Sequence, residues 1–208
     1  MRKGIFISFE GTDGSGKTTQ IALLSEYLDV KGFEPLVLRE PGGAVISERI
    51  RSVVLDNRHT EMDQVTEMLL YAASRAQLVA QIILPSLNAG KCVICDRFVD
   101  SSYIYQGFAR GLGMETVKAV NDIATRNLMP DITFFMDVDP EVALKRRFDS
   151  SQPDRLEMEG VAFQLKVYEG YIQLCKLYPE RMKRISGTEG IDASFSQIKS
   201  YMDAFLCR

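Results

Sequence analysis

Histidine, cysteine and long apolar runs are scarce in this chain, and each shortage excludes a class of protein. The single histidine, His59, lies in a polar stretch that predicts an exposed loop, so catalysis by a histidine base is not expected. The four cysteines do not indicate a disulfide framework in 208 residues, which favours a reducing cytoplasm. No run of about 18 apolar residues occurs, so we expect no membrane span and no membrane partner.

A basic excess and an N-terminal secretion signal are also missing. Lys and Arg number 25 against 28 Asp and Glu, which gives a formal net charge of −3. Because domains that bind nucleic-acid polymers usually carry a basic excess, we expect no such partner. The first apolar residues are interrupted at Glu10, too early for a secretory signal.

Cys92 and Cys95 form a C-x-x-C pair, which could in principle hold a metal or act in redox chemistry. They lie in a short apolar run that predicts a buried strand. Residues three apart on a strand point to opposite faces and cannot easily share one zinc ion, and a redox C-x-x-C normally begins a helix. We therefore expect both cysteines to be core residues.

Apolar runs and helical periodicities alternate along the chain. Short apolar runs predict strands over 4–9, 35–38, 92–95, 132–138 and 182–185. Apolar residues at helical spacing predict helices that follow the glycine-rich loop to Gly32 and that cover 46–54, 65–83 (bent by Pro85), 114–126, 159–178 and 195–206. Asp139 and Pro140 predict the cap and first residue of one more helix.

This alternation is typical of a parallel sheet covered by helices on both faces, a three-layer α/β/α fold. The balance of 46% hydrophobic and 25% charged residues is that of an ordinary globular protein, and the length suits one domain over residues 1–208. Residues 148–155 are polar, and we expect a lid at about 146–157.

Residues 11–18, here called the phosphate loop, match the pattern G-x-x-x-x-G-K-[ST]. Small residues let successive backbone N–H groups turn inward as an anion cradle, and the helix that follows directs its N-terminal partial charge at the phosphates. Lys17 is expected to reach the terminal phosphates and Thr18 to help hold Mg²⁺. An apolar strand before the loop and a periodic helix after it give the motif its required context.

Asp96 ends the third predicted strand, where a carboxylate that supports Mg²⁺ would stand. The next residue is Arg97, whereas a motor-type ATPase would place there an acid that prepares a water. The guanine-binding Asn-Lys-x-Asp of GTPases is absent. Phosphoryl transfer to an already ionised phosphate needs cations and no general base, which suits a chain rich in arginine and poor in histidine.

We therefore expect a small nucleotide-using kinase that binds two phosphate-bearing substrates. Two alternatives stay open at this point. The acceptor could be another nucleoside monophosphate, or the chain could be a binding module that hydrolyses ATP slowly to change partners.

The order of several motifs resembles the thymidylate kinases along essentially the whole chain. The motifs are Phe9 to Thr19, Arg39-Glu40-Pro41-Gly42-Gly43, Leu70 to Gln77, Asp96-Arg97-Phe98 leading to Tyr105-Gln106-Gly107, and Asp154-Arg155-Leu156. The resemblance implies transfer of the γ-phosphate of ATP to dTMP with Mg²⁺ as cofactor. It also implies a homodimer, and the apolar face of the helix through Val65 to Ile83 could contact a twin, although periodicity alone fits a core face equally well.

The resemblance assigns each substrate a set of residues. ATP would bind Gly11, Thr12, Asp13, Gly14, Ser15, Gly16, Lys17, Thr18 and Thr19, with Thr18 and Asp96 at the metal. dTMP would bind Asp13, Glu40, Arg51, Tyr71, Arg75, Arg97, Ser102, Tyr105 and Gln106. In this scheme Asp13 contacts the sugar 3′-hydroxyl, Arg51 and Arg97 hold the acceptor phosphate, and Tyr105 crowds a ribose 2′-hydroxyl.

The base would be recognised by the remaining members of the second set. Tyr71 would stack on thymine, Arg75 would donate to a base carbonyl, and Ser102 and Gln106 would read the base edge. The family carries its catalytic arginine either in the phosphate loop or in the lid. Because residues 12–15 contain no arginine, the chain looks like the lid-arginine form, with Arg147 and Arg155 as candidates beside Lys17, Asp13 and Arg97.

Overall fold

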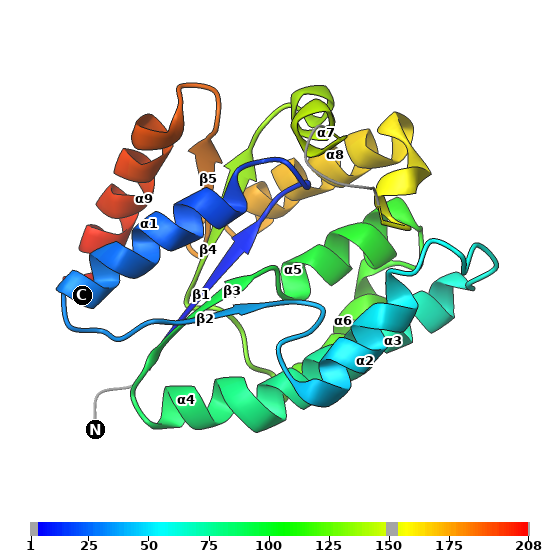
Figure 1. The fold of residues 1–208 in the computed structure, drawn as a ribbon, viewed down its shortest axis with the longest axis horizontal. Helices are drawn as coiled ribbons and strands as arrows, with labels where there is room; N and C mark the ends of the chain where they lie inside the picture. Colours follow the sequence, from blue (N-terminus) through cyan, green and yellow to red (C-terminus); the bar gives the residue numbers. More distant parts are fainter. Residues whose placement is uncertain (1–3, 149–153, 208) are drawn as a thin grey trace.

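Five strands form one sheet in the computed structural model, which describes residues 4–148 and 154–207 (Figure 1). The strands are β1 (Ile5–Glu10), β2 (Leu36–Arg39), β3 (Cys92–Asp96), β4 (Ile132–Asp137) and β5 (Met182–Ser186). They lie in the order β2-β3-β1-β4-β5, and every pairing is parallel. The predicted parallel sheet is confirmed, and each strand boundary lies within one residue of its prediction.

Two helices cover one face of this sheet. These are α1 (Lys17–Val30) and α9 (Ile191–Leu206), which lie side by side in Figure 1. Their apolar residues form one buried cluster with alternate residues of the strands, among them Ile5, Ile7 and Phe9 of β1. This alternation is what a strand buried on both faces requires.

The other face packs against a second, larger cluster of apolar residues. Phe6, which lies between Ile5 and Ile7 on β1, points to this side. The helical elements outside the first layer are α2 (Val45–Val54), α3 (Gln64–Leu78), η1 (Val79–Ile83), α4 (Leu84–Asn88), α5 (Val99–Ser102), η2 (Tyr103–Ala109), α6 (Met114–Thr125), α7 (Pro140–Phe148), η3 (Glu157–Glu159) and α8 (Val161–Leu177). The fold is therefore the predicted three-layer α/β/α sandwich.

The two cysteines of the C-x-x-C pair point to opposite faces of β3. Cys92 belongs to the cluster under α1 and α9, and Cys95 belongs to the cluster on the other face. Both are buried, and neither forms a disulfide. The prediction that they are core residues is confirmed.

Residues 99–109 form helical structure that the sequence pattern did not predict. The four-residue helix α5 passes into η2, a π-helical segment, and this stretch is buried from Val99 to Gly107 on nearly all sides. This stretch has buried polar residues, among them Asp100, Ser102 and Gln106, mixed with its apolar ones, so it shows no amphipathic periodicity and the pattern gave no signal. π-helical turns often occur at functional sites, and η2 carries Tyr105 and Gln106.

Pro85 follows a second π-helical turn, η1, where the long helix passes from α3 to α4. Proline cannot donate the usual backbone hydrogen bond, and the wider turn accommodates that loss. The last helix begins at Ile191, four residues before the predicted start at Phe195.

The helical run Gln64–Asn88 is long and apolar enough to span a membrane by length and composition alone. It lies beside α2 and α6 and contributes buried Glu67 and Arg75 to the interior. Its buried apolar residues, among them Met68, Ala72 and Leu78, thus belong to the interior of the fold.

The carboxyl ends of three adjacent strands, β2, β3 and β1, meet at one edge of the sheet. Phe9 of β1 and Arg39 of β2 both pair in register with Asp96, the last residue of β3. Because the strands are parallel, the residues that follow them gather at the same edge. The phosphate loop, Arg97 and the Glu40–Pro41 turn are placed together in this way.

Candidate active site

The phosphate loop joins β1 to α1 at this edge and is stabilised by its own lysine. Lys17 is 5% exposed, and its Nζ donates to the backbone oxygens of Gly11 at 3.0 Å and Thr12 at 2.9 Å. Gly14 and Gly16 have φ values of 83° and 90°, which side chains rarely adopt. The spacing of glycines predicted from the motif is therefore required by the backbone, and the lysine lies inside the cradle.

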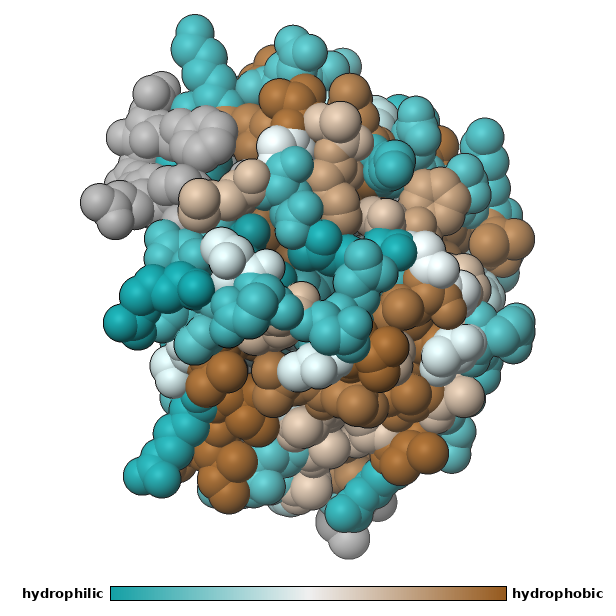
Figure 2. Space-filling model, turned by 90° about the vertical axis from the view of Figure 1, so that its right-hand side faces the viewer, coloured by the Kyte–Doolittle hydropathy of each residue, from teal (hydrophilic) through white to brown (hydrophobic). Residues whose placement is uncertain are grey.

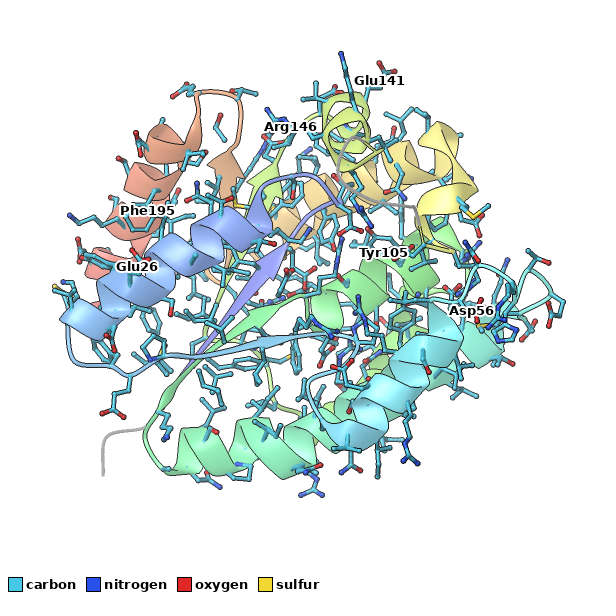
Figure 3. All side chains as sticks on the ribbon, viewed as in Figure 1. Glu26, Asp56, Tyr105, Glu141, Arg146 and Phe195 are labelled. Atoms are coloured by element: carbon cyan, nitrogen blue, oxygen red, sulfur yellow. The ribbon has the colours of Figure 1, made fainter. Side chains whose placement is uncertain are left out.

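Helix α7 packs directly on the phosphate loop. A Cβ at Gly14 would lie 2.0 Å from the backbone oxygen of Ala143 and 3.2 Å from the backbone nitrogen of Arg147. The helix begins as predicted, because Asp139 Oδ1 accepts hydrogen bonds from the backbone N–H groups of residues 141 and 142. Figure 3 shows Arg146 on this helix at the edge of the molecule, whereas the charge of Arg147 acts on Asp13 of the loop.

A cleft, here called the central cleft, opens beside the phosphate loop. It is lined by Asp13, Arg39, Glu40, Pro41, Arg51, Leu55, Tyr71, Arg75, Asp96, Arg97, Ser101, Ser102, Tyr105, Gln106, Asp154 and Leu156. All nine residues that the resemblance assigns to the acceptor are in this set.

Arg97 joins the cleft to the phosphate loop. It has a φ of 68°, and its Nη2 donates to Asp13 Oδ1 at 2.9 Å while Nη1 donates to Ser101 Oγ at 3.2 Å. Its guanidinium lies 5.4 Å from the ring centre of Tyr105, which Figure 3 shows at the middle of the molecule. Burial opposes ionisation of Asp13, but the cations of Arg97 and Lys17 hold the pKa of Asp13 well below its usual range.

Glu10 stabilises the segment of chain that follows Arg97. It is fully buried and accepts hydrogen bonds from the backbone N–H of Phe98 at 2.8 Å, from Ser101 Oγ at 2.6 Å and from Tyr171 Oη at 2.7 Å. Burial and the nearby Asp100 carboxylate raise the pKa of Glu10 to about 7, although the Arg97 cation and two of these hydrogen bonds oppose the shift. Sequence reasoning missed Glu10 and Ser101 because their roles depend on contacts across the sheet.

Arg75 is buried under the cleft with nearly all its donors in use. Its Nε donates to Glu40 Oε2 at 2.7 Å, Nη1 donates to Ser102 Oγ at 2.8 Å and to Asn121 Oδ1, and Nη2 donates to the backbone oxygen of Phe98 at 3.1 Å. Burial raises the pKa of Glu40, and the Arg75 cation opposes that shift. Arg75 is thus fixed in one orientation, which is what precise recognition of a planar ligand needs.

Buried polar atoms without a partner gather around the phosphate loop and the cleft. Among the described residues, such atoms are Thr12 Oγ1, Ser15 Oγ, Gln20 Oε1, Glu40 Oε1, Asp96 Oδ1 and Tyr105 Oη. Unpaired buried polar atoms are rare and costly, so a cluster of them marks a place where a ligand supplies the missing partners.

Arg155 contacts the last residue of α2 and a residue of α3. Its Nη2 donates to Glu67 Oε2 at 2.6 Å and its Nε donates to the backbone oxygen of Val54 at 3.0 Å. Its neighbours Asp154 and Leu156 line the cleft. Residues 149–153 of the predicted lid lie outside the described residues. Of the two arginines predicted for the lid, the structure brings Arg147 to the phosphate loop and pairs Arg155 with Glu67.

Comparison with known proteins identifies relatives along nearly the whole chain. The profile of a family described as thymidylate kinase matches residues 9–198. A thymidylate kinase of Caldanaerobacter subterraneus subsp. tengcongensis is 53% identical over 204 residues, covering 98% of this chain and 97% of the relative. One of Clostridium novyi is 45% identical over 204 residues, with coverage of 97% and 100%. A crystal structure of thymidylate kinase from Ehrlichia chaffeensis aligns with a TM-score of 0.78 and 33% identity, covering 97% of this chain and 99% of that one.

Proposed function

The chain belongs to the thymidylate kinase family and phosphorylates dTMP to dTDP, and we propose that ATP binds the phosphate loop while dTMP fills the central cleft. The observation that carries this assignment is the cluster of unpaired buried oxygens shared by the loop and the cleft. It marks two adjoining sites at one edge of the sheet. The alternatives of another acceptor base or a slow nucleotide switch give way to this family assignment.

In the proposed mechanism, an oxygen of the dTMP phosphate attacks the γ-phosphorus of ATP in line with the leaving ADP. The acceptor phosphate is already ionised, so no general base is needed. Lys17 and Arg97 offset the charge on the transferring group, and Arg51 helps to hold the acceptor phosphate. Asp13, fixed by Arg97 at 2.9 Å, accepts a hydrogen bond from the sugar 3′-hydroxyl and positions the acceptor.

We propose that the base lies deeper in the cleft. Tyr71 stacks on the thymine ring, and Arg75, Ser102 and Gln106 contact its polar edge. Tyr105 lies against the deoxyribose, where a ribose 2′-hydroxyl would be crowded. Steric exclusion is a sensible device here, because affinity alone discriminates weakly against an added hydroxyl.

Mg²⁺ is the proposed cofactor, and the residues present fit it. Asp96 has a buried carboxylate oxygen without a partner, and Thr18 lies in the first turn of α1 beside Lys17. Within 4–148 and 154–207, no group of three or more His, Cys, Asp or Glu side chains could hold a metal by itself. That suits Mg²⁺, which keeps waters and phosphate oxygens among its ligands and, when bound, offsets phosphate charge.

An acceptor panel tests the assignment of the two sites. With ATP and Mg²⁺, we expect dTMP to stimulate ADP release far more than dCMP, dGMP or ribothymidine monophosphate, and EDTA to abolish it. ADP release is followed by a coupled assay at saturating ATP. Release that does not depend on any acceptor, or stronger stimulation by another monophosphate, would contradict the assignment of dTMP to the central cleft.

We propose the lid-arginine form of the enzyme, with Arg147 as the lid cation nearest the phosphate loop in this conformation. Arg147→Ala is expected to lower kcat by about 10²-fold or more with a smaller change in the KM for ATP, because the contact strengthens in the transition state. Arg155→Ala is expected to act mainly on the KM for dTMP and on Tm, because Arg155 anchors residues that line the cleft.

Steady-state kinetics of both variants separate the two roles. Arg146→Ala is the matched control, because Arg146 is exposed on the same helix, and we expect near-normal turnover. If Arg155→Ala loses kcat and Arg147→Ala does not, the catalytic cation of the lid is Arg155, which would then have to leave Glu67 during the reaction.

A homodimer is proposed from exposed apolar side chains on adjacent helices. Val45, Ile46 and Val53 of α2, with Val65 and Leu69 of α3, are between 43% and 72% exposed. Figure 2 views the molecule from the right-hand side of Figure 1, and apolar surface gathers in its lower half. Such a patch on a monomer is costly and is typical of an interface. Light scattering that gives twice the 23.4 kDa chain mass supports the dimer, and a monomer mass contradicts it.

The proposed organisation is one catalytic domain over residues 1–208, with a lid at about 146–157. The proposed compartment is the cytoplasm. The cytoplasm is supported by four cysteines that all remain free, two of them buried. Fractionation of producing cells tests the compartment, and recovery in a membrane or secreted fraction would contradict it.

A further inference from the structure

Glu67 on α3 lies behind the central cleft and binds three side chains from distant parts of the chain. It is 1% exposed and does not line the cleft itself. Its Oε1 accepts from Gln106 Nε2 at 2.9 Å, and its Oε2 accepts from Arg110 at 3.1 Å and from Arg155 at 2.6 Å. Neither the phosphate loop nor the proposed mechanism uses this carboxylate, so its cluster needs its own explanation.

The contact with Glu67 fixes which end of the Gln106 side-chain amide faces the central cleft. A carboxylate only accepts hydrogen bonds, so the NH₂ end of Gln106 must point toward Glu67. Turning the amide over would place Gln106 Oε1 against the carboxylate in a buried site, where repulsion is weakly screened. Gln106 is 2% exposed and lines the cleft, and its Oε1 accepts no hydrogen bond from any described residue. The end available to a ligand is therefore an acceptor.

We propose that Glu67 is a positioning residue for base selection, which locks Gln106 so that an acceptor oxygen meets the base. This rests on the proposed function, in which dTMP fills the central cleft. A thymine ring presents an N3–H donor beside a carbonyl, so it pairs with the Gln106 oxygen and the Arg75 guanidinium. A cytosine ring presents an N3 acceptor, which would face the Gln106 oxygen, and an amino group, which would face the Arg75 guanidinium. Acceptor would then meet acceptor, and donor would meet donor.

Without the contact to Glu67, the Gln106 amide could turn over and offer either its oxygen to thymine or its NH₂ group to cytosine. A site that fixes its hydrogen-bonding groups rejects the mismatched ligand strongly, since buried groups are left unpaired. The pairing of Glu67 with Arg110 and Arg155 holds the carboxylate itself in place. The contact with Arg155 connects the proposed lid to the choice of base.

The test compares dTMP and dCMP binding in Glu67→Gln. The amide introduced by this substitution can offer either an oxygen or an NH₂ group, so the Gln106 amide is free to turn. We expect the ratio of the dCMP Kd to the dTMP Kd, measured by calorimetry, to fall by about 10-fold or more. Arg110→Ala is the matched control: it removes one of the two arginines that pair with Glu67, whereas Arg155 still holds the carboxylate and Gln106 is untouched. The ratio is therefore expected to stay within about twofold of the wild-type value.

A charge exchange keeps the proposal testable if Glu67→Gln folds poorly. In Glu67→Gln/Gln106→Glu, the new glutamate accepts from the new glutamine and still presents an oxygen to the base, so the wild-type ratio is expected to return. A folded Glu67→Gln that keeps the wild-type ratio, or a folded exchange variant that loses it, overturns the proposal. A wild-type protein without preference for dTMP would instead contradict the proposed assignment of the central cleft.

Discussion

Lys17→Ala is expected to reduce kcat by about 10³-fold or more while the protein remains folded. Lys17 lies within the phosphate loop with its Nζ on two backbone oxygens and 3.6 Å from Asp13 Oδ1. Burial and the Arg97 cation lower the pKa of Lys17, while Asp13, Asp96 and Glu10 oppose that shift. A bound triphosphate adds negative charge that this ammonium is already placed to meet, so its removal leaves the transferring phosphate poorly neutralised.

The measurement is kcat at saturating ATP and dTMP, with thermal unfolding as the check on folding. Lys31→Ala is the matched control, because Lys31 is a half-exposed lysine at the opposite end of α1, where it pairs with Asp203 of α9. It is expected to retain near-normal turnover. A folded Lys17→Ala protein with more than about a tenth of wild-type kcat would show that the loop holds no reacting phosphate.

The phosphate loop could be predicted from sequence because everything it needs is local. An apolar strand, a run of small residues and a periodic helix follow one another within 30 residues, and the backbone between them is dictated by Gly14 and Gly16. The parallel sheet was predictable for a similar reason, since each strand is an apolar run that carries its own signal. Asp96 and Arg97 could be predicted as site residues because they lie at the end of such an apolar run.

The contacts behind the cleft could not be predicted, because the partners are far apart in sequence. Glu67 meets Gln106 from 39 positions away and Arg155 from 88, and Arg75 meets Asn121 from 46. The one local signal was a pair of charged residues, Glu67 and Arg75, on the buried side of an apolar helix. A buried charge requires a partner, but the sequence does not say which one.

Arg97→Ala is expected to lower kcat/KM for dTMP by about 10³-fold or more, with little change in ATP binding. Arg97 holds Asp13, and in the proposed mechanism it also holds the acceptor phosphate, so its loss removes a cation and releases the residue that positions the sugar. The substitution adds no backbone strain, because a φ of 68° is about equally unfavourable for alanine and for arginine. The effect is thus on the site and not on the turn.

Two further variants separate charge from geometry at this position. Arg97→Lys keeps a cation but cannot contact Asp13 and Ser101 with one planar group, so we expect it to recover only part of the loss. Arg58→Ala removes an exposed arginine that pairs with Asp56 and is expected to leave turnover near normal. Calorimetry with ATP alone checks that the phosphate loop is intact in each variant. A folded Arg97→Ala protein with near-normal kcat/KM for dTMP would place the acceptor phosphate elsewhere, with Arg39, Arg51 and Arg75 as the remaining arginines of the central cleft.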